Sequence, residues 1–528
     1  MIEPFINEIF FKRISDDSAW CSVITRIRCI PIATMAATAS PSDEQVHKVP
    51  LKVLVDRKKN RVLFAETEKD FVDVLLSFLT LPLGTIARLV AKDSNIQPMR
   101  VGSVSSLYES VSNLEEKHLR TQTCKEMLLQ PRNSLESYCQ QLKLNIDDTE
   151  PMKYFICNKS DCFRKQSGSL YSIFKNQRCS CGSVMNRVVS PEYLTIENGF
   201  VKETATFIIC DDLYIMPNVF GASFNLFHKL GIEDMEAVEE QTVEITKKEV
   251  VDLLKFSLIS NTPMTDFILK REQYLDKFTP MDQYQFEIGE VPSQEGRQMV
   301  VKVQLRKSNG KILFAEVEED FADFLFSFLT FPLGGVLHML HGFSSLSCID
   351  KLYKSMTELS SDRYLKSQGL KEKLSKPLCA PQFNPSNQIL PIGAECLPAY
   401  YCYSYLKDGF YHPILVTSVK CNFYPYETNV LSNIIDPKFP AGESSSPQGF
   451  VKGPSMYMVT DDLVVTPISS ISAVSYLNRL KVPIFDLEER ILTLGVKECL
   501  GILKASLTST SALTNGLKHL IKTIKDEN

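Results

Sequence analysis

Residues 52–84 read KVLVDRKKNRVLFAETEKDFVDVLLSFLTLPLG, and residues 302–334 read KVQLRKSNGKILFAEVEEDFADFLFSFLTFPLG. Between 51–84 and 301–334, 18 of 34 positions are identical without a gap. The two stretches are 250 residues apart, whereas the repeats of solenoid proteins have periods of roughly 20–50 residues. The pattern therefore predicts a duplicated domain, and each copy is long enough to bury a core of its own.

The similarity returns further along the chain. GFVK at 199–202 is followed by DDL at 211–213, and GFVK at 449–452 is followed by DDL at 461–463. These shared positions set the expected boundaries of the two copies. The predicted organisation is an N-terminal extension at 1–45, a first copy at 46–267, a linker at 268–297, a second copy at 298–515 and a tail at 516–528.

Each copy is expected to open with a β-hairpin, at 51–66 in the first copy. Asn309-Gly310 in the second copy is a strong hairpin-turn signal because both residues accept a positive φ. A helix should follow, with Thr67 as its N-cap, and Pro82 and Pro332 should end the two equivalent helices. A small cysteine-containing β segment, a second hairpin around the Asp-Asp pair and a C-terminal helix complete each copy. Hairpins and helices are segregated, so the fold class is α+β.

The composition is that of an ordinary globular protein, with 44% hydrophobic and 23% charged residues. A net charge of −5 argues against an electrostatic nucleic-acid interface, which needs a clustered basic surface. The chain has 15 cysteines and shows no secretory signal. We therefore expect an intracellular protein in a reducing compartment, in the cytoplasm first and in the nucleus as the second choice.

The first 34 residues differ from the rest. They carry the single tryptophan, Trp20, together with acidic residues that fit neither a signal peptide nor an acid-poor transit peptide. From Met35 the chain continues as MAATASPSDE, which reads as a natural start followed by a polar lead-in. We therefore expect residues 1–34 to be an upstream extension.

Three stretches carry a resemblance to a known family: KVLVDRKKNRVLFAE at 52–66, DFVDVLLSFLTLPLGTIARL at 70–89 and YMVTDDLVVTPISSISAVSYLNRL at 457–480. The chain resembles the plant-restricted family called domain of unknown function 674. The resemblance implies the duplicated layout, a plant origin and the start at Met35. It implies no activity, cofactor or catalytic residue, because none is established for the family.

Four cysteines form the strongest candidate site: Cys157, Cys162, Cys179 and Cys181, followed by Gly182. Two cysteine pairs on neighbouring turns can hold one structural Zn²⁺ in tetrahedral geometry. The spacing departs from the usual two-residue gap in both pairs, so free thiols are the alternative interpretation.

The second copy keeps only Cys402 and Cys421 near the matching places, with Lys407 and Phe423 where partners would stand. The second copy should therefore fold without metal. The predicted zinc would then stabilise the first copy locally and would not be a requirement of the fold. A site closed by four thiolates leaves no position for water, so it would be structural rather than catalytic.

Asp211-Asp212 and Asp461-Asp462 are the next candidates, because paired carboxylates can act as acid and base. Adjacent strand residues point to opposite faces, and aspartate is a favoured turn residue. The turn interpretation is therefore preferred. His338 and His341 are three residues apart but have no third ligand nearby, so we interpret them as ordinary surface or half-buried histidines.

Residues 324–349 contain no charged side chain other than histidine and are long enough for a membrane span. The matching stretch of the first copy contains Arg88 and Lys92, so a pair of buried core helices is preferred. The chain also has no Gly-rich phosphate loop, nucleophile elbow or HExxH pattern.

We predict a non-enzymatic interaction or scaffold protein with protein partners of unknown identity. The alternatives are a metal-assisted nucleic-acid-binding protein and an enzyme with a groove between the copies. The nucleic-acid-binding alternative would fail if no RNA or DNA bound. A deep pocket lined by the Asp-Asp pairs would favour the enzyme, and exposure of these pairs on a hairpin tip would refute it.

Overall fold

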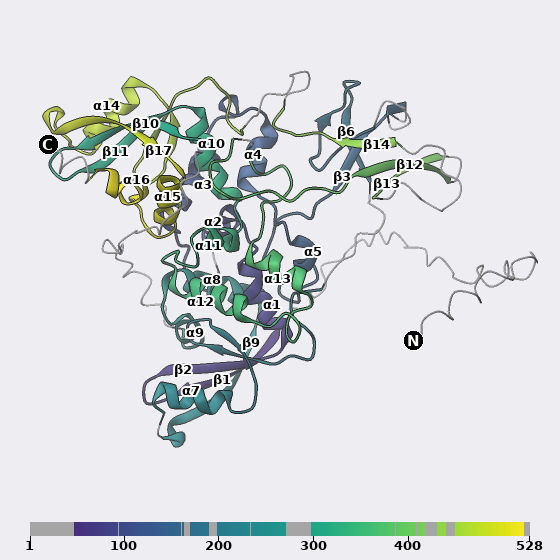
Figure 1. The fold of residues 1–528 in the computed structure, drawn as a ribbon, viewed down its shortest axis with the longest axis vertical. Coiled ribbons are helices and arrows are strands. Elements are labelled where there is room, and N and C mark those ends of the chain that lie inside the picture. Colours follow the sequence, from purple (N-terminus) through teal and green to yellow (C-terminus); the bar gives the residue numbers. More distant parts are fainter. Residues whose placement is uncertain are drawn as a thin grey trace, which may run out of the picture. The chain divides into compact units, whose positions relative to one another are not determined.

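The structure is a computed structural model with mixed α and β architecture and several sheets (Figure 1). It describes residues 47–521 except 93, 160, 163–168, 190–197, 233, 271–296, 386, 408–409, 418–429 and 440–448. The extension at 1–45 with its start at Met35, most of the linker and the end of the tail lie outside the described residues. The chain from His47 onward forms one compact unit.

The first five-stranded sheet has the order β8-β7-β2-β1-β9. Its strands are β1 (Val49–Asp56), β2 (Arg61–Thr67), β7 (Phe207–Cys210), β8 (Ile215–Pro217) and β9 (Val238–Ile245). The β1–β2 hairpin is confirmed, and Asn60 in its turn has a φ of +48°. Thr67 is the last residue of β2 and not a helix cap, so that prediction is wrong: the N-cap of the next helix is Glu68, which makes no side-chain capping bond.

The second five-stranded sheet has the order β16-β15-β11-β10-β17, which matches the first strand for strand. Its strands are β10 (Met299–Arg306), β11 (Lys311–Val317), β15 (Tyr457–Thr460), β16 (Val465–Pro467) and β17 (Leu487–Leu494). Gly310 in the predicted turn has a φ of +72°, which costs glycine little. In both sheets a hairpin late in the sequence extends the opening hairpin. We call the described residues up to 270 the first half and those from 297 onward the second half.

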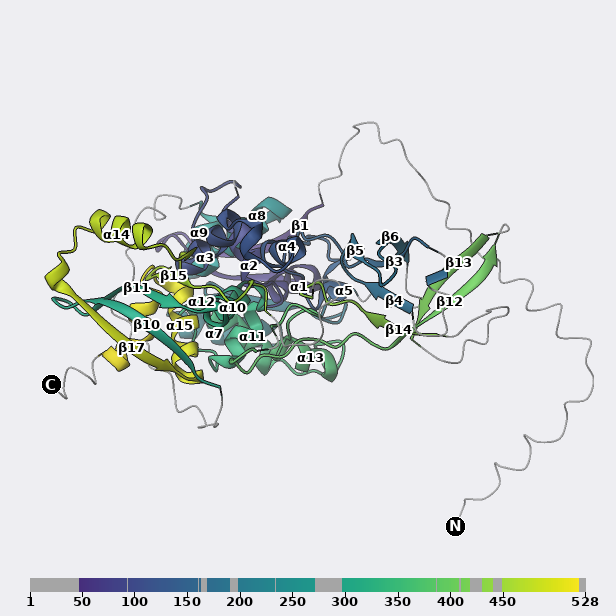
Figure 2. The ribbon, with the colours of Figure 1, turned by 90° about the horizontal axis from the view of Figure 1, so that it is seen from above.

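Four almost wholly buried apolar helices follow the two opening hairpins (Figures 1 and 2). They are α1 (Lys69–Phe78), α2 (Leu83–Val90), α10 (Glu319–Ser327) and α11 (Leu333–Met339). The segments that start α2 and α11 lie against each other in a reciprocal pair of bonds. The Leu83 amide donates to the Phe331 carbonyl and the Leu333 amide to the Leu81 carbonyl, both at 2.9 Å. Pro82 and Pro332, where helices were predicted to break, therefore form one of the contacts between the halves.

Two further helices are exchanged between the halves. Helix α3 (Gly102–Asn113) packs on α15 (Val496–Thr508) of the second half, and α12 (Ser347–Glu358) packs on α8 (Lys247–Ile259) of the first half. The Ser103 hydroxyl donates to the Ser509 carbonyl at 2.7 Å. Each half therefore completes the core of the other.

A buried carboxylate explains the repeated GFVK motif. One carboxylate oxygen of Asp73, a fully buried residue of α1, accepts bonds from the Phe200 and Val201 amides at 2.7 and 3.0 Å. Asp323 of α10 accepts the corresponding pair of bonds at 2.7 and 2.8 Å. A Cβ at Gly199 would lie only 2.0 Å from the second Asp73 oxygen, so glycine is needed there.

The third sheet contains strands from both halves, in the order β13-β12-β14-β4-β3-β6-β5. Its strands are β3 (Tyr154–Cys157), β4 (Ser169–Ser172), β5 (Gln177–Arg178), β6 (Val184–Val189), β12 (Tyr400–Lys407), β13 (Phe410–Val416) and β14 (Val430–Ile434). β14 pairs with β4 in parallel, and the hydroxyls of Tyr154 and Tyr400 lie 3.1 Å apart.

The remaining helices of the described residues lie around these sheets. They are α4 (Gln122–Leu129), α5 (Glu136–Cys139), α7 (Ala222–Leu230), α9 (Pro263–Ile268), α13 (Gln368–Ser375), α14 (Ser470–Arg479) and α16 (Ala512–Gly516).

Candidate metal centre

The third sheet brings the four predicted cysteines together. Cys157 is the last residue of β3, and Cys162 lies in the turn after it. Cys179 and Cys181 lie in the hairpin between β5 and β6, and β6 pairs with β3. The hairpin therefore places the second pair of thiols beside the end of β3.

The four sulfur atoms lie within 4.8 Å of one another, and those of Cys157 and Cys181 are 3.6 Å apart. Four sulfurs each about 2.3 Å from a tetrahedral Zn²⁺ would be about 3.8 Å apart. The cluster is thus close to the spacing of a tetrahedral thiolate site, and it is too open for a disulfide, whose S–S length is about 2.05 Å. The arrangement is compatible with metal binding.

The backbone around the cysteines is shaped to hold the sulfurs in place. The Lys159 amide donates to the Cys157 sulfur at 3.4 Å. In the hairpin, the Gly182 amide donates to the Cys179 carbonyl at 2.8 Å, and Gly182 has a φ of +81°. The sequence signal for this turn was the glycine that follows Cys181.

The thiols differ in their surroundings. Cys157 and Cys179 are buried, and Cys162 and Cys181 are half-buried. Hydrogen bonds from the Ser183 hydroxyl and backbone lower the pKa of Cys181 to about 6, whereas burial raises the pKa of Cys157 and Cys162. Its surroundings therefore favour the thiolate form of Cys181, and a bound cation would draw protons from the other thiols.

Among the described residues, this is the only group of three or more histidine, cysteine or acidic side chains close enough to share an ion. Cys402 is buried in β12, and Cys421 and Phe423 lie outside the described residues, as does the side chain of Lys407.

His338 and His341 do not belong to the cysteine cluster. His338 faces the Tyr353 hydroxyl at 3.5 Å, and burial lowers its pKa. His341 follows the end of α11 with a φ of +53°.

The Asp-Asp pairs lie in tight hairpin turns, as the preferred interpretation holds. The turn between β7 and β8 closes with a 3.0 Å bond from the Leu213 amide to the Cys210 carbonyl. Asp211 accepts two bonds from Thr265, both at 2.8 Å, and burial raises its pKa to about 6. Asp212 accepts from the Tyr214 amide at 3.3 Å.

The second half repeats this arrangement. Asp461 accepts from the Thr514 amide at 2.8 Å, and Asp462 accepts from the Thr460 hydroxyl at 2.5 Å. In both halves the first carboxylate anchors the helix-bearing segment that follows, and the second stabilises its own turn.

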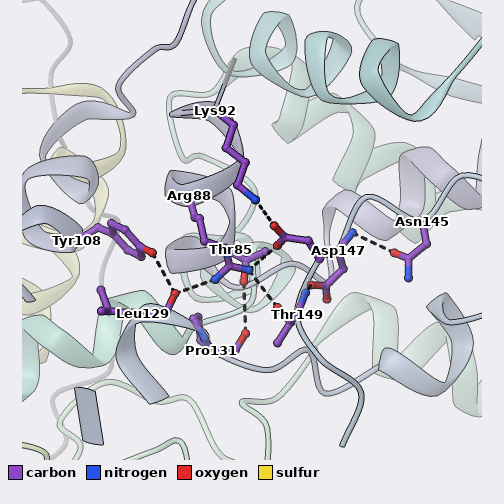
Figure 3. Close-up of polar contacts among 10 residues, drawn as sticks. Thr85, Arg88, Lys92, Tyr108, Leu129, Pro131, Asn145, Asp147 and Thr149 are labelled. Atoms are coloured by element: carbon purple, nitrogen blue, oxygen red, sulfur yellow. Dashed lines mark hydrogen bonds and ion pairs between the residues drawn. The ribbon is translucent and has the colours of Figure 1, made fainter. Parts of the chain in front are cut away.

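Figure 3 shows the polar contacts made by α2 and by Lys92, which follows its end. Arg88 donates to the Leu129 carbonyl at 2.7 Å and to Asp148 at 2.6 Å, and Lys92 also pairs with Asp148. The Tyr108 hydroxyl reaches the same Leu129 carbonyl at 3.1 Å. Most residues of α2 and of α11 are buried, so both are core helices. No helix among the described residues has the length and apolar composition that a membrane span requires.

Comparison with known proteins gives a family and nothing more specific. No curated protein and no solved structure matches the chain. One family model, described as a protein of unknown function, matches residues 45–497, which is most of the chain and includes all three stretches that carried the resemblance. The chain therefore belongs to the protein family of unknown function DUF674.

Proposed function

We propose that Cys157, Cys162, Cys179 and Cys181 bind one structural Zn²⁺ that fastens the third sheet. The convergence of the four sulfurs within 4.8 Å carries this proposal. Four thiolates in tetrahedral geometry are typical of zinc or of iron–sulfur centres, and a closed site of this kind contributes to folding.

The position of the cysteines suggests how a bound metal would stabilise the third sheet. The cysteines share a small core cluster whose other fully buried members are Phe155 and Met185. Burial of so few apolar side chains stabilises a short sheet only modestly. A metal would hold the end of β3 against the β5–β6 hairpin, and the same sheet joins strands of both halves through β4 and β14.

Metal analysis of the purified full-length chain tests this proposal. We expect about one zinc per chain, lost in the double variant Cys179→Ser/Cys181→Ser. Cys396→Ser, at an exposed cysteine outside the cluster, is the matched control and should keep its zinc. Iron in place of zinc, a metal-free protein or a Cys157–Cys181 disulfide would each refute the assignment.

For the whole chain we propose a non-enzymatic interaction protein of two homologous copies, 46–267 and 298–515, joined by a linker at 268–297. Matching strand orders in the two five-stranded sheets support the duplication. We place it inside a plant cell, in the cytoplasm first and the nucleus second, since so many free thiols suit a reducing compartment.

Exposed apolar side chains beside the second sheet support protein partners. Ile484 and Phe485, in the turn that leads into β17, are 87% and 82% exposed. Ile491, further along β17, is exposed as well. Adjacent exposed apolar residues of this kind mark interaction sites more often than isolated ones do.

A comparison of two baits tests the interaction role. Wild-type chain and the Ile484→Asp/Phe485→Asp variant are immobilised at equal density and exposed to the same plant extract. We expect at least one protein to bind the wild type in stoichiometric amount and to be lost from the variant. Identical sets of captured proteins, with both baits folded, would contradict a role for this surface.

A further inference from the structure

Each five-stranded sheet bears a pocket beside its late hairpin. The α7 pocket, about 1030 Å³ in volume, lies between β2, the β7–β8 turn, α7 and α12. The α14 pocket, about 580 Å³, lies between β11, the β15–β16 turn and α14. Small-molecule sites commonly have volumes of about 300–1,000 Å³, so both cavities have the size of ligand sites.

The two pockets share an apolar floor. Leu63 of β2 and Leu226 of α7 line the first pocket, and Leu313 of β11 lines the second. In the second pocket Tyr476 of α14 also contributes, its ring edge-on to Phe314 with the centroids 6.3 Å apart. Each floor offers an apolar surface on which the body of a ligand can rest.

Each Asp-Asp carboxylate in the walls has at least one hydrogen bond or ion pair within the chain, although Asp461 Oδ2 accepts no hydrogen bond. Asp211 is bonded to Thr265, and Asp212 pairs with Lys351 of α12. In the second pocket, Asp461 lies 3.6 Å from Lys311. These acidic groups therefore do not call for a cationic ligand, and the cations that pair with them are also occupied.

One basic side chain in each pocket remains available. Lys229 lies in the last turn of α7 and Arg479 in the last turn of α14, and they are 250 residues apart, the separation of the repeated stretches. Neither forms an ion pair with any described residue. Arg479 lies over the Tyr476 ring, 5.1 Å from its centroid, and both side chains border the pocket.

We propose that each pocket binds one small amphipathic anion, an organic carboxylate or phosphate monoester with an apolar body. The anionic head pairs with Lys229 or Arg479, and the body covers the apolar floor. Guanidinium and ammonium groups are suited to such heads, and burial of the body supplies most of the affinity. The recurrence of cavity, floor and unpaired cation in both halves supports a binding role.

Fluorescence titration of the full-length chain with 8-anilinonaphthalene-1-sulfonate tests the proposal, since this probe is itself a small amphipathic anion. We expect two sites per chain. Lys229→Glu and Arg479→Glu should each weaken one site by about tenfold or more, the cost of losing a charge-assisted contact. The double variant should lose both sites. Lys229→Arg should keep binding at the α7 pocket.

Control variants and control ligands distinguish specific binding in the two pockets from non-specific hydrophobic binding. Lys248→Glu and Lys497→Glu, exposed lysines at matching places on α8 and α15, should bind as the wild type does. Decanoate and decyl phosphate should displace the probe, and their relative potency distinguishes a carboxylate from a phosphate head; decanol and decylamine should not. Unchanged binding in the double variant, equal displacement by decanol, or no binding to a folded wild type would overturn the proposal.

Discussion

Replacing Gly449 by alanine should destabilise the folded chain. A Cβ at this position would lie 1.6 Å from the second carboxylate oxygen of Asp323, so the carboxylate must move. Its other oxygen holds the buried amides of Phe450 and Val451 at 2.7 and 2.8 Å. A shift that relieves the clash therefore breaks both bonds.

The size of the effect follows from these two amides. Each buried N–H left without an acceptor costs about 1–3 kcal/mol, so the variant should lose about 2–6 kcal/mol. Unfolding entropy is about 2.1 cal/mol/K per residue, which sums to about 1 kcal/mol/K over the compact unit from His47 onward. The melting temperature should therefore fall by about 2–6 °C.

Thermal unfolding followed by circular dichroism measures this shift. Gly369→Ala is the control, because Gly369 lies in the first turn of α13 and nothing stands within 4 Å of an added Cβ. That variant should melt at or slightly above the wild-type temperature, since alanine favours the helix. If Gly449→Ala melts with this control, the steric argument for the GFVK motif is refuted.

Three more predictions rest on buried groups. Burial raises the pKa of Asp323 to about 7, whereas an aspartate of the unfolded chain has a pKa of about 4. Between these two values the folded chain keeps a proton that the unfolded chain has released. The free energy of unfolding should therefore fall as the pH rises from about 4 to about 7. Asp323→Asn should remove that slope and melt above the wild type at alkaline pH. A zinc chelator should lower the melting temperature of the wild type but not of Cys179→Ser/Cys181→Ser. Lys255→Met should lower it by leaving several loop carbonyls unpaired, whereas exposed Lys248→Met should not.

The elements near the repeated stretch were predictable because their signals are local. The hairpin turn at Asn309-Gly310 and the helix breaks at Pro82 and Pro332 depend on the φ preferences of single residues, and the structure bears them out. The prediction of Thr67 as an N-cap was wrong because β2 pairs with β7 and the strand therefore continues through Thr67. A local sequence pattern does not indicate pairing with a strand so far along the chain.

Most of α3 is buried, although serine is the commonest residue in its sequence. Its small hydroxyl side chains allow close packing on the other half: a Cβ at Gly102 would lie 2.4 Å from the Ser506 carbonyl. Lys229 and Arg479 belong to no sequence motif, and only the pockets beside them indicate a role.

The repeated hairpins and helices, the cysteine pairs and the turns at the Asp-Asp pairs could be predicted from the amino-acid sequence, because periodicity, turn residues and spacing act over a few neighbouring residues. Only the tertiary structure decided which half each helix completes, that strands of both halves share a third sheet, and that four sulfurs meet. These outcomes depend on contacts between residues far apart in the chain, where burial of apolar surface and satisfaction of buried polar groups select one arrangement.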